Sequence, residues 1–231
     1  MRQIKINSIS QQIEISGDDA KHLIYSLRSK VGEKISVIDK NNQRALMELS
    51  NFTKDKVTAR LIEYLPMRKE NFIHLAISIP KKNFDNIIRQ ATEIGVATIQ
   101  PLITERTVAR PSISRQERWQ KISSEASQQS GALEPIIKPI LTLDEFLNQV
   151  SGQIIFCNEC ESNRKIFDVE LNDELTLIIG CEGGFAEDEA EKIKSIGAIS
   201  VTLGEIIFKV DTATIFSLAT IKSVLNQEKK F

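Results

Sequence analysis

The sequence predicts an α/β protein in which a mostly parallel sheet is covered by helices on both faces, preceded by a small β-rich domain. Two observations carry this prediction. From residue 72 to the C-terminus, apolar runs alternate with helical patterns, and strands that alternate with helices form parallel sheets. Before Pro66, three short β-type runs follow one another closely.

The first of these regions, residues 1–70, is expected to form a small antiparallel barrel or sandwich with one helix. Its β-type runs are KISVID (34–39), RALMELS (44–50) and KVTARLIEY (56–64), and turn-forming residues 40–42 join the first two. Asp18 or Asp19 is positioned to cap a short helix through DDAKHLIYSL. A module of this size often serves in binding.

The second region, residues 71–231, is expected to form the larger α/β domain. Strands are predicted at 72–80, 96–102, 153–158, 175–180 and 198–204, and helices at 83–95, 114–131, 187–197 and 211–225. Gly95 is expected to end the first helix. The last helix is apolar around most of its circumference, which indicates burial against either a second subunit or one large core.

Composition narrows the class of protein. The 231 residues are 41% hydrophobic, with no apolar run of eighteen residues and no signal-peptide pattern at MRQIKINSIS, so we expect a cytoplasmic protein without a membrane segment. Cys157 and Cys160 form a CxxC pair, but no further ligands stand at a matching spacing. We therefore expect no metal site.

Charge is balanced overall and unevenly distributed. The net charge is -1, which ordinarily argues against a nucleic-acid partner. Residues 1–70, however, carry thirteen basic and nine acidic residues, a net charge of +4, which leaves -5 for the remainder. A solvated surface accounts for this asymmetry as well as an RNA-binding face does.

Three loops at carboxyl ends of the predicted strands are candidates for a ligand site: 101–110, 180–185 and 203–214. Glycines in the second loop, GCEGGF, allow a close approach of the backbone to a ligand. The spacing matches neither a dinucleotide fingerprint nor a P-loop, and taken alone it is explained by a tight turn.

Several motifs together resemble a known family. LIIGCEGGFAEDE is followed about twenty residues later by LG-x-x-I-x-K-x-D-T-A, and ATEIGVATIQPLITERTV lies upstream. AKHLIYSLRSKVGE (20–33) and ERWQKISSEASQQSG (117–131) extend the similarity over nearly the whole chain. The sequence thus resembles the RsmE-type SPOUT methyltransferases, which methylate N3 of a uridine in 16S ribosomal RNA. The resemblance implies a PUA-like β-barrel, a trefoil-knotted domain, a homodimer and S-adenosylmethionine as methyl donor.

The resemblance also implies which residues bind the methyl donor: Leu102, Gly180, Glu182, Gly183, Leu203, Gly204, Ile207 and Phe208. Loops with apolar walls and no lysine suit a sulfonium cation better than a phosphate. For Glu182 two roles remain open. It hydrogen-bonds the ribose or a partner subunit, or its carboxylate satisfies nearby loop N–H groups.

The third loop holds the residues to which we assign the chemistry. Lys209 is assigned to stabilising an anion or phosphate, and Asp211 to orienting it or helping with the proton of uridine N3. Asp211 also suits the N-cap of the last helix. The RNA-binding candidates are Arg28, Lys30, Arg106, Arg110, Arg115 and Arg118. For the last two, intrahelical pairing with Glu117 or Glu125 is the alternative.

Five positions depart from the family pattern: Ala132, Cys181, Ile206, Lys209 and Asp211. At position 209 the family has arginine, whose rigid guanidinium fork can contact phosphate through two N–H groups, whereas lysine offers only a point charge. Such departures are expected to affect activity. The leading hypothesis is an S-adenosylmethionine-dependent 16S ribosomal RNA methyltransferase. The alternatives are a non-catalytic RNA-binding dimer with the same fold and a Rossmann-type nucleotide enzyme.

Overall fold

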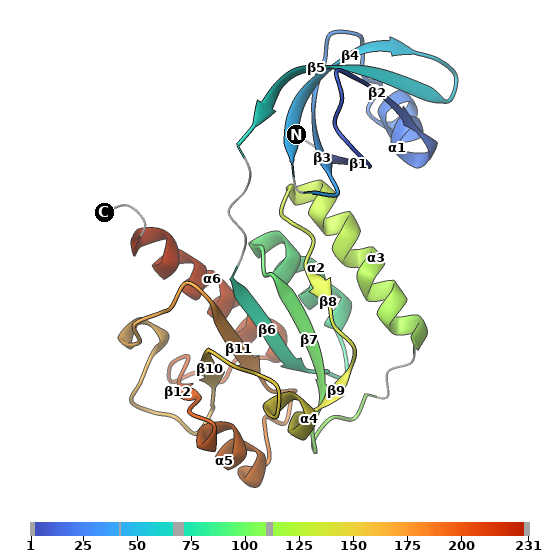
Figure 1. Cartoon of the computed structure of the whole chain (residues 1–231). Helices are drawn as coiled ribbons and strands as arrows, with labels where there is room; N and C mark the ends of the chain where they lie inside the picture. The colour runs from blue at the N-terminus through green and yellow to red at the C-terminus, as the bar shows by residue number, and fades with distance from the viewer. Residues whose placement is uncertain (1–2, 42, 67–71, 110–112, 229–231) are drawn as a thin grey trace. The chain divides into compact units, whose positions relative to one another are not determined.

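The computed structural model describes residues 3–41, 43–66, 72–109 and 113–228. The chain divides into two compact units (Figure 1). The first comprises residues 1–69 together with 127–133, and the second comprises residues 70–126 and 134–231.

The first unit is built on a five-stranded sheet. Its elements are β1 (Gln3–Ile6), β2 (Gln12–Ser16), α1 (Gly17–Lys21), the π-helical turn η1 (His22–Ser26), β3 (Lys34–Asp39), β4 (Arg44–Phe52) and β5 (Lys56–Leu65). The strand order is β1-β3-β4-β5-β2. β1 runs parallel to β3, and the remaining pairs are antiparallel. The three predicted runs are thus confirmed as strands.

Alternation of side chains explains how this sheet forms a core. Ala45, Met47 and Leu49 of β4, and Val57 and Ala59 of β5, are fully buried, at a spacing of two residues. Two sequence expectations for this unit were wrong. The sheet is not wholly antiparallel, and the first helix begins after Ser16, so neither Asp18 nor Asp19 caps it.

The second unit is built on a parallel sheet. Its elements are β6 (Ile73–Ser78), α2 (Phe84–Ile94), β7 (Thr98–Ile103), α3 (Ile113–Ser130), β8 (Ile136–Ile137), β9 (Leu141–Thr142), α4 (Leu143–Leu147), β10 (Gln153–Cys157), η2 (Ile166–Asp168), β11 (Leu175–Ile179), α5 (Glu187–Ser195), β12 (Ile199–Val201) and α6 (Val210–Glu228). The strand order is β12-β10-β11-β6-β7-β8, and β9 also pairs with β7. Each described pair is parallel.

Helices cover both faces of this sheet, as predicted (Figure 1). On one face, alternate residues of β6 such as Leu75 and Ile77 pack with apolar side chains of α2 and α6. On the other face, Ala76 and Ile178 pack with Phe146 of α4 and with α5. Because successive strand residues point to opposite faces, one apolar run supplies both cores.

The last helix, α6, is buried along one stripe. Thr214, Ser217, Leu218 and Ile221 are inaccessible to solvent, whereas Phe216 on the opposite side is 42% exposed. No helix within the described ranges has the length and apolar character needed to cross a membrane.

Candidate active site

A pocket lies where the neighbouring strands β12, β10 and β11 end. Because these three strands are parallel and adjacent, the loops that leave their carboxyl ends converge at one edge of the sheet. The lining residues come from these loops and the first turn of α6: Cys157, Asn158, Glu159, Ile179, Gly180, Cys181, Thr202, Leu203, Gly204, Ile206, Ile207, Phe208, Val210 and Ala213.

The second of these loops is a tight glycine turn. The backbone N–H of Gly184 donates to the carbonyl of Cys181 at 2.9 Å and closes the turn over Glu182 and Gly183. Gly184 has φ +68°, and a Cβ at this position would lie 2.6 Å from Oε1 of Glu159. A Cβ on Gly180 would lie 3.1 Å from backbone atoms of Gly184. The left-handed φ of Gly184 therefore favours glycine there, and a side chain at Gly180 would crowd the backbone of the turn.

Residues outside the pocket hold this turn in place. Arg106, in the loop after β7, donates from its guanidinium to the carbonyl of Gly183. The thiol of Cys181 donates to the carbonyl of Arg106 at 3.3 Å. Both oxygens of Glu182 accept from the backbone N–H of Lys81, at 2.9 and 3.1 Å. For Glu182, the structure thus realises the alternative in which the carboxylate satisfies a loop N–H group.

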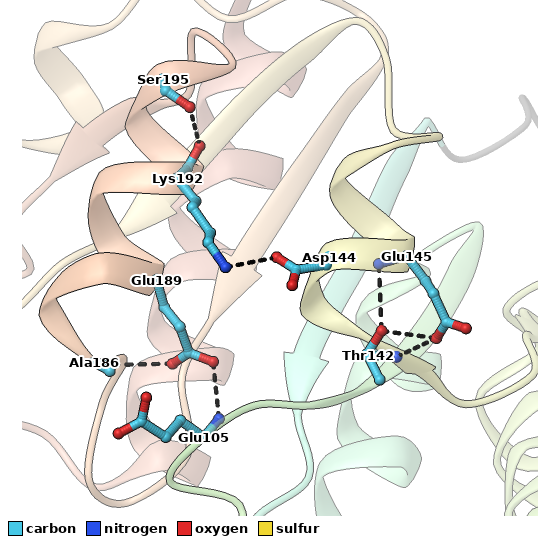
Figure 2. Close-up of polar contacts among 8 residues, drawn as sticks. All are labelled: Glu105, Thr142, Asp144, Glu145, Ala186, Glu189, Lys192 and Ser195. Carbon is cyan, nitrogen blue, oxygen red and sulfur yellow. Dashed lines mark hydrogen bonds and ion pairs between the residues drawn. The ribbon is translucent and has the colours of Figure 1, made fainter.

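A second brace involves the buried carboxylate of Glu189 on α5, shown in Figure 2. It accepts from the backbone N–H of Glu105 at 2.8 Å and from that of Ala186 at 3.0 Å. One acidic side chain thus joins the loop after β7 to the start of α5. Figure 2 also shows Lys192 of α5 paired with Asp144 of α4 at 2.9 Å.

The third loop carries apolar side chains that remain open to solvent. Ile206 is 73% exposed and Ile207 is 81% exposed. The ring of Phe208 contacts the ring of Phe216 on α6, with centroids 5.3 Å apart. At the start of this loop, Thr202 accepts the backbone N–H of Gly204 through its hydroxyl at 3.2 Å.

The proposed catalytic pair lies at the start of α6. Lys209 is exposed and directly precedes the helix, which begins at Val210. One oxygen of Asp211 accepts from the side-chain amide of Asn83 at 3.3 Å. Because α6 begins at Val210, Asp211 is the second residue of the helix. The sequence interpretation of Asp211 as an N-cap is therefore wrong.

Cys157 lines the pocket from the end of β10. Burial raises the pKa of this thiol to about 12, opposed in part by its hydrogen bond to the Ser217 hydroxyl. The group is a neutral thiol at physiological pH, and it is not the reactive thiolate of a redox pair. Cys160, its CxxC partner in sequence, is exposed.

The structure gathers some of the sequence-predicted cofactor residues and separates others. Gly180, Leu203, Gly204, Ile207 and Phe208 line the pocket. Leu102, Glu182 and Gly183 are not among the lining residues. Leu102 is 0% exposed because its side chain packs in the core beneath α4, so the structure does not bring it to the site.

Sequence reasoning missed the end of β10 and the loop after it, which contribute Cys157, Asn158 and Glu159. The predicted strand at 153–158 was the available signal, because ligands lie at the carboxyl ends of parallel strands. The loop 101–110 was chosen in its place, and it braces the glycine turn from outside through Arg106.

The basic residues predicted to bind RNA fall in both units. Arg28 and Lys30 are exposed in the first unit, and Arg28 has φ +52°. Arg115 and Arg118 are exposed on α3, and Arg118 pairs with Asp85 of α2 and not with Glu117 or Glu125. Arg110 lies outside the described residues.

Comparison with known proteins gives matches along most of the chain. A family model described as an RNA methyltransferase domain matches residues 67–222, and one described as an RNA methyltransferase PUA domain matches residues 15–62. Ribosomal RNA small subunit methyltransferase E of Synechocystis sp. is 33% identical over 86% of this chain and 69% of its own length. Ribosomal RNA small subunit methyltransferase E of Rickettsia conorii is 30% identical over 92% of this chain and 90% of its own length.

A solved structure agrees in fold and carries a ligand. Ribosomal RNA small subunit methyltransferase E from Neisseria gonorrhoeae, bound to S-adenosyl methionine, has a TM-score of 0.86 and is 26% identical. The alignment covers 97% of this chain and 98% of that one.

Proposed function

The chain belongs to the RNA methyltransferase family that includes ribosomal RNA small subunit methyltransferase E, and on that premise we propose that it methylates N3 of a uridine in 16S ribosomal RNA. The methyl donor in this proposal is S-adenosylmethionine. The observation that carries the proposal is the glycine-walled pocket at the ends of β10, β11 and β12. We also place residues 1–70 as an RNA-binding domain and 71–231 as the methyltransferase domain, acting in the cytoplasm.

The pocket lining fits this donor. S-adenosylmethionine supplies an electrophilic methyl group on a positively charged sulfur. Neither lysine nor arginine occurs among the described lining residues, so nothing there repels the sulfonium, and Glu159 adds a carboxylate. Gly180 and the apolar residues Leu203 and Phe208 offer the walls that an adenine needs.

The start of α6 supplies the groups that act on the substrate in this proposal. Uridine N3 carries a proton near neutral pH, so it must lose this proton as the N–C bond forms and the C–S bond breaks with its electron pair left on sulfur. We assign Asp211 to receiving or steering the proton, and Asn83 holds its carboxylate. Lys209 is assigned to the negative charge that develops on the uracil ring or to an adjoining phosphate.

A homodimer completes the proposal. Ile206 and Ile207 of the pocket-lining loop, and Phe216, which contacts Phe208 of the same loop, form an exposed apolar patch on the second unit. Exposed apolar patches of this kind mark interaction sites, and a second copy of the chain is the occupant we propose. We further propose that the segment entering α6 is threaded as a trefoil knot. The contact of Thr202 with Arg164, whose carbonyl accepts its N–H at 2.7 Å, supports a close passage of these two segments.

Calorimetry with S-adenosylmethionine and mass spectrometry of ribosomal RNA test this function together. We expect heat of binding, and loss of N3-methyluridine from 16S ribosomal RNA when the gene is deleted. Lys209→Ala and Asp211→Asn should lower kcat by roughly 10²-fold or more while heat of donor binding persists. An unchanged N3-methyluridine content in the deletion strain would defeat the enzymatic proposal and favour a non-catalytic RNA-binding dimer.

A further inference from the structure

A second cavity in the methyltransferase domain is strongly basic. It is formed by residues 79–83, the first half of α2 and one side of α3, and we call it the basic groove. Its lining residues are Ile79, Pro80, Lys81, Lys82, Asn83, Phe84, Asp85, Asn86, Arg89, Arg115, Arg118 and Trp119. Five of these are cationic and one is acidic, so the lining carries a net charge of +4 in a domain that is acidic as a whole.

The cations of the basic groove are mostly free to meet a ligand. Across the described ranges, no ion pair engages Lys82, Arg89 or Arg115, and Arg118 pairs with Asp85. Like charges that face one cavity without carboxylate partners repel one another. A bound anionic ligand would relieve that repulsion. A surface on which positive and negative charges are interspersed has no such repulsion to relieve.

The wall of the basic groove is formed by two helices packed against each other. Phe84 of α2 and Trp119 of α3 meet edge to face, with ring centroids 4.7 Å apart, and both side chains are buried. This contact fixes the two helices that carry Arg89 and Arg115. The relative positions of Arg89 and Arg115 are therefore set by the packing of α2 against α3.

The basic groove is also joined to the active site by direct hydrogen bonds. The backbone N–H of Lys81 donates to Glu182 in the glycine turn, and the side chain of Asn83 donates to Asp211 at the start of α6. A strand of RNA lying in the basic groove would thus run beside the two segments that carry the methyl-donor pocket and the proposed catalytic pair.

We propose that the basic groove binds the phosphate backbone of the RNA next to the uridine that is methylated. The inference rests on the proposed function and extends it to residues that sequence analysis did not single out, Lys81, Lys82 and Arg89. Arginine guanidinium groups match phosphate oxygens in a two-pronged geometry, and lysines add point charges. Phosphate contacts of this kind position the nucleic acid without reading its sequence.

The test compares a groove variant with a matched control. Arg89→Gln/Arg115→Gln removes two groove charges, and Lys192→Gln/Lys194→Gln removes two exposed charges from α5, outside the groove. Binding of in vitro transcribed 16S ribosomal RNA is measured from 50 to 300 mM salt. We expect the groove variant to bind roughly tenfold more weakly at low salt, with a salt dependence shallower by about 1.5 in log–log slope. The control should keep both values within about twofold of wild type.

Further measurements distinguish a failure of this inference from a failure of the proposed methyltransferase function. Calorimetry with S-adenosylmethionine should give the same heat for both variants and wild type, and KM for RNA should rise in the groove variant with kcat little changed. If wild type and the groove variant bind RNA with equal affinity and equal salt dependence, the proposal that the basic groove binds RNA is wrong, even where methylation activity is observed. If wild type binds polyglutamate more tightly than RNA, the RNA proposal is wrong and the groove binds an acidic protein partner. Absence of donor binding in wild type would overturn the function, while the salt series still decides the groove.

Discussion

The carboxylate of Glu182 accepts the backbone N–H of Lys81 with both of its oxygens, at 2.9 and 3.1 Å. This contact joins two loops that are about a hundred residues apart in sequence. Glu182 sits at the corner of the glycine turn, and its neighbours Gly180 and Cys181 line the pocket. The residue therefore orders the pocket wall without lining the pocket.

Glu182→Ala should loosen the glycine turn. A hydrogen bond to a charged group contributes about 1.5 to 3 kcal/mol, so we expect the Kd for S-adenosylmethionine to rise roughly ten- to a hundredfold in calorimetry. Affinity for RNA should change little. Glu187→Ala, which removes an exposed carboxylate from the first turn of α5, is the matched control and should bind the donor as wild type does. Wild-type donor affinity in Glu182→Ala would show that the turn holds its shape without this tether.

Gly184→Ala should impair the pocket by two effects. The substituted residue must keep φ near +68°, which costs about 1 kcal/mol, and its Cβ meets the carboxylate of Glu159, a pocket-lining side chain. Gly197→Ala is the matched control, because φ is +86° there and the added Cβ meets no atom within 4 Å. We expect both variants to lose about 1 kcal/mol of stability and only Gly184→Ala to lose donor affinity. Equal donor affinity in the two would contradict the steric role of Glu159.

The buried carboxylate of Glu189 should matter for stability. It is 7% exposed and accepts from the backbone of Glu105 and of Ala186 (Figure 2). Glu189→Ala leaves two backbone N–H groups without their partner, so we expect the free energy of unfolding in urea to fall by about 2 to 4 kcal/mol. Glu191→Ala, two residues along the same helix with an exposed ion pair to Lys194, should cost less than about 0.5 kcal/mol. A loss below 1 kcal/mol for Glu189→Ala would argue that water replaces the carboxylate.

Sequence patterns located the larger domain well because its strands are continuous apolar runs. β6, β10 and β11 are buried on both faces, and such runs stand out between charged helices. β1 and β2 were missed because Gln3–Ile6 and Gln12–Ser16 are short and mix polar with apolar residues. β8 and β9 have two residues each, which is too short for any periodicity.

The site was predicted only in part, because the local sequence pattern of a strand does not show which strands are its neighbours in the sheet. Two of the three chosen loops line the pocket, since their strands β11 and β12 both lie next to β10. The loop after β10 itself was passed over, because nothing in the residues around Cys157 shows that its strand lies between the other two. Only part of the basic groove was visible in the sequence. Arg115 was an RNA-binding candidate, but Arg89 comes beside it only through the packing of α2 against α3.

The thiol of Cys157 gives a prediction about pH. Its pKa is raised to about 12 by burial, so the folded state holds the proton more tightly than the unfolded chain, in which the pKa is near 9. This contribution to stability is fully present below pH 9 and is lost as pH rises toward 12, with a limiting slope of about 1.4 kcal/mol per pH unit. Because lysines and tyrosines titrate in the same range, the quantity to measure is the difference in free energy of unfolding between wild type and Cys157→Ala.

That difference should shrink between pH 9 and pH 10.5 and stay constant between pH 6 and pH 8. Alkylation by iodoacetamide gives an independent readout, because only the thiolate reacts. At pH 8 we expect the exposed Cys160 to be modified in the native protein and Cys157 to be protected until urea unfolds the chain. Cys160→Ala serves as the control that removes the fast-reacting site. Equal alkylation rates at Cys157 and Cys160 in the native protein would contradict the raised pKa of the Cys157 thiol.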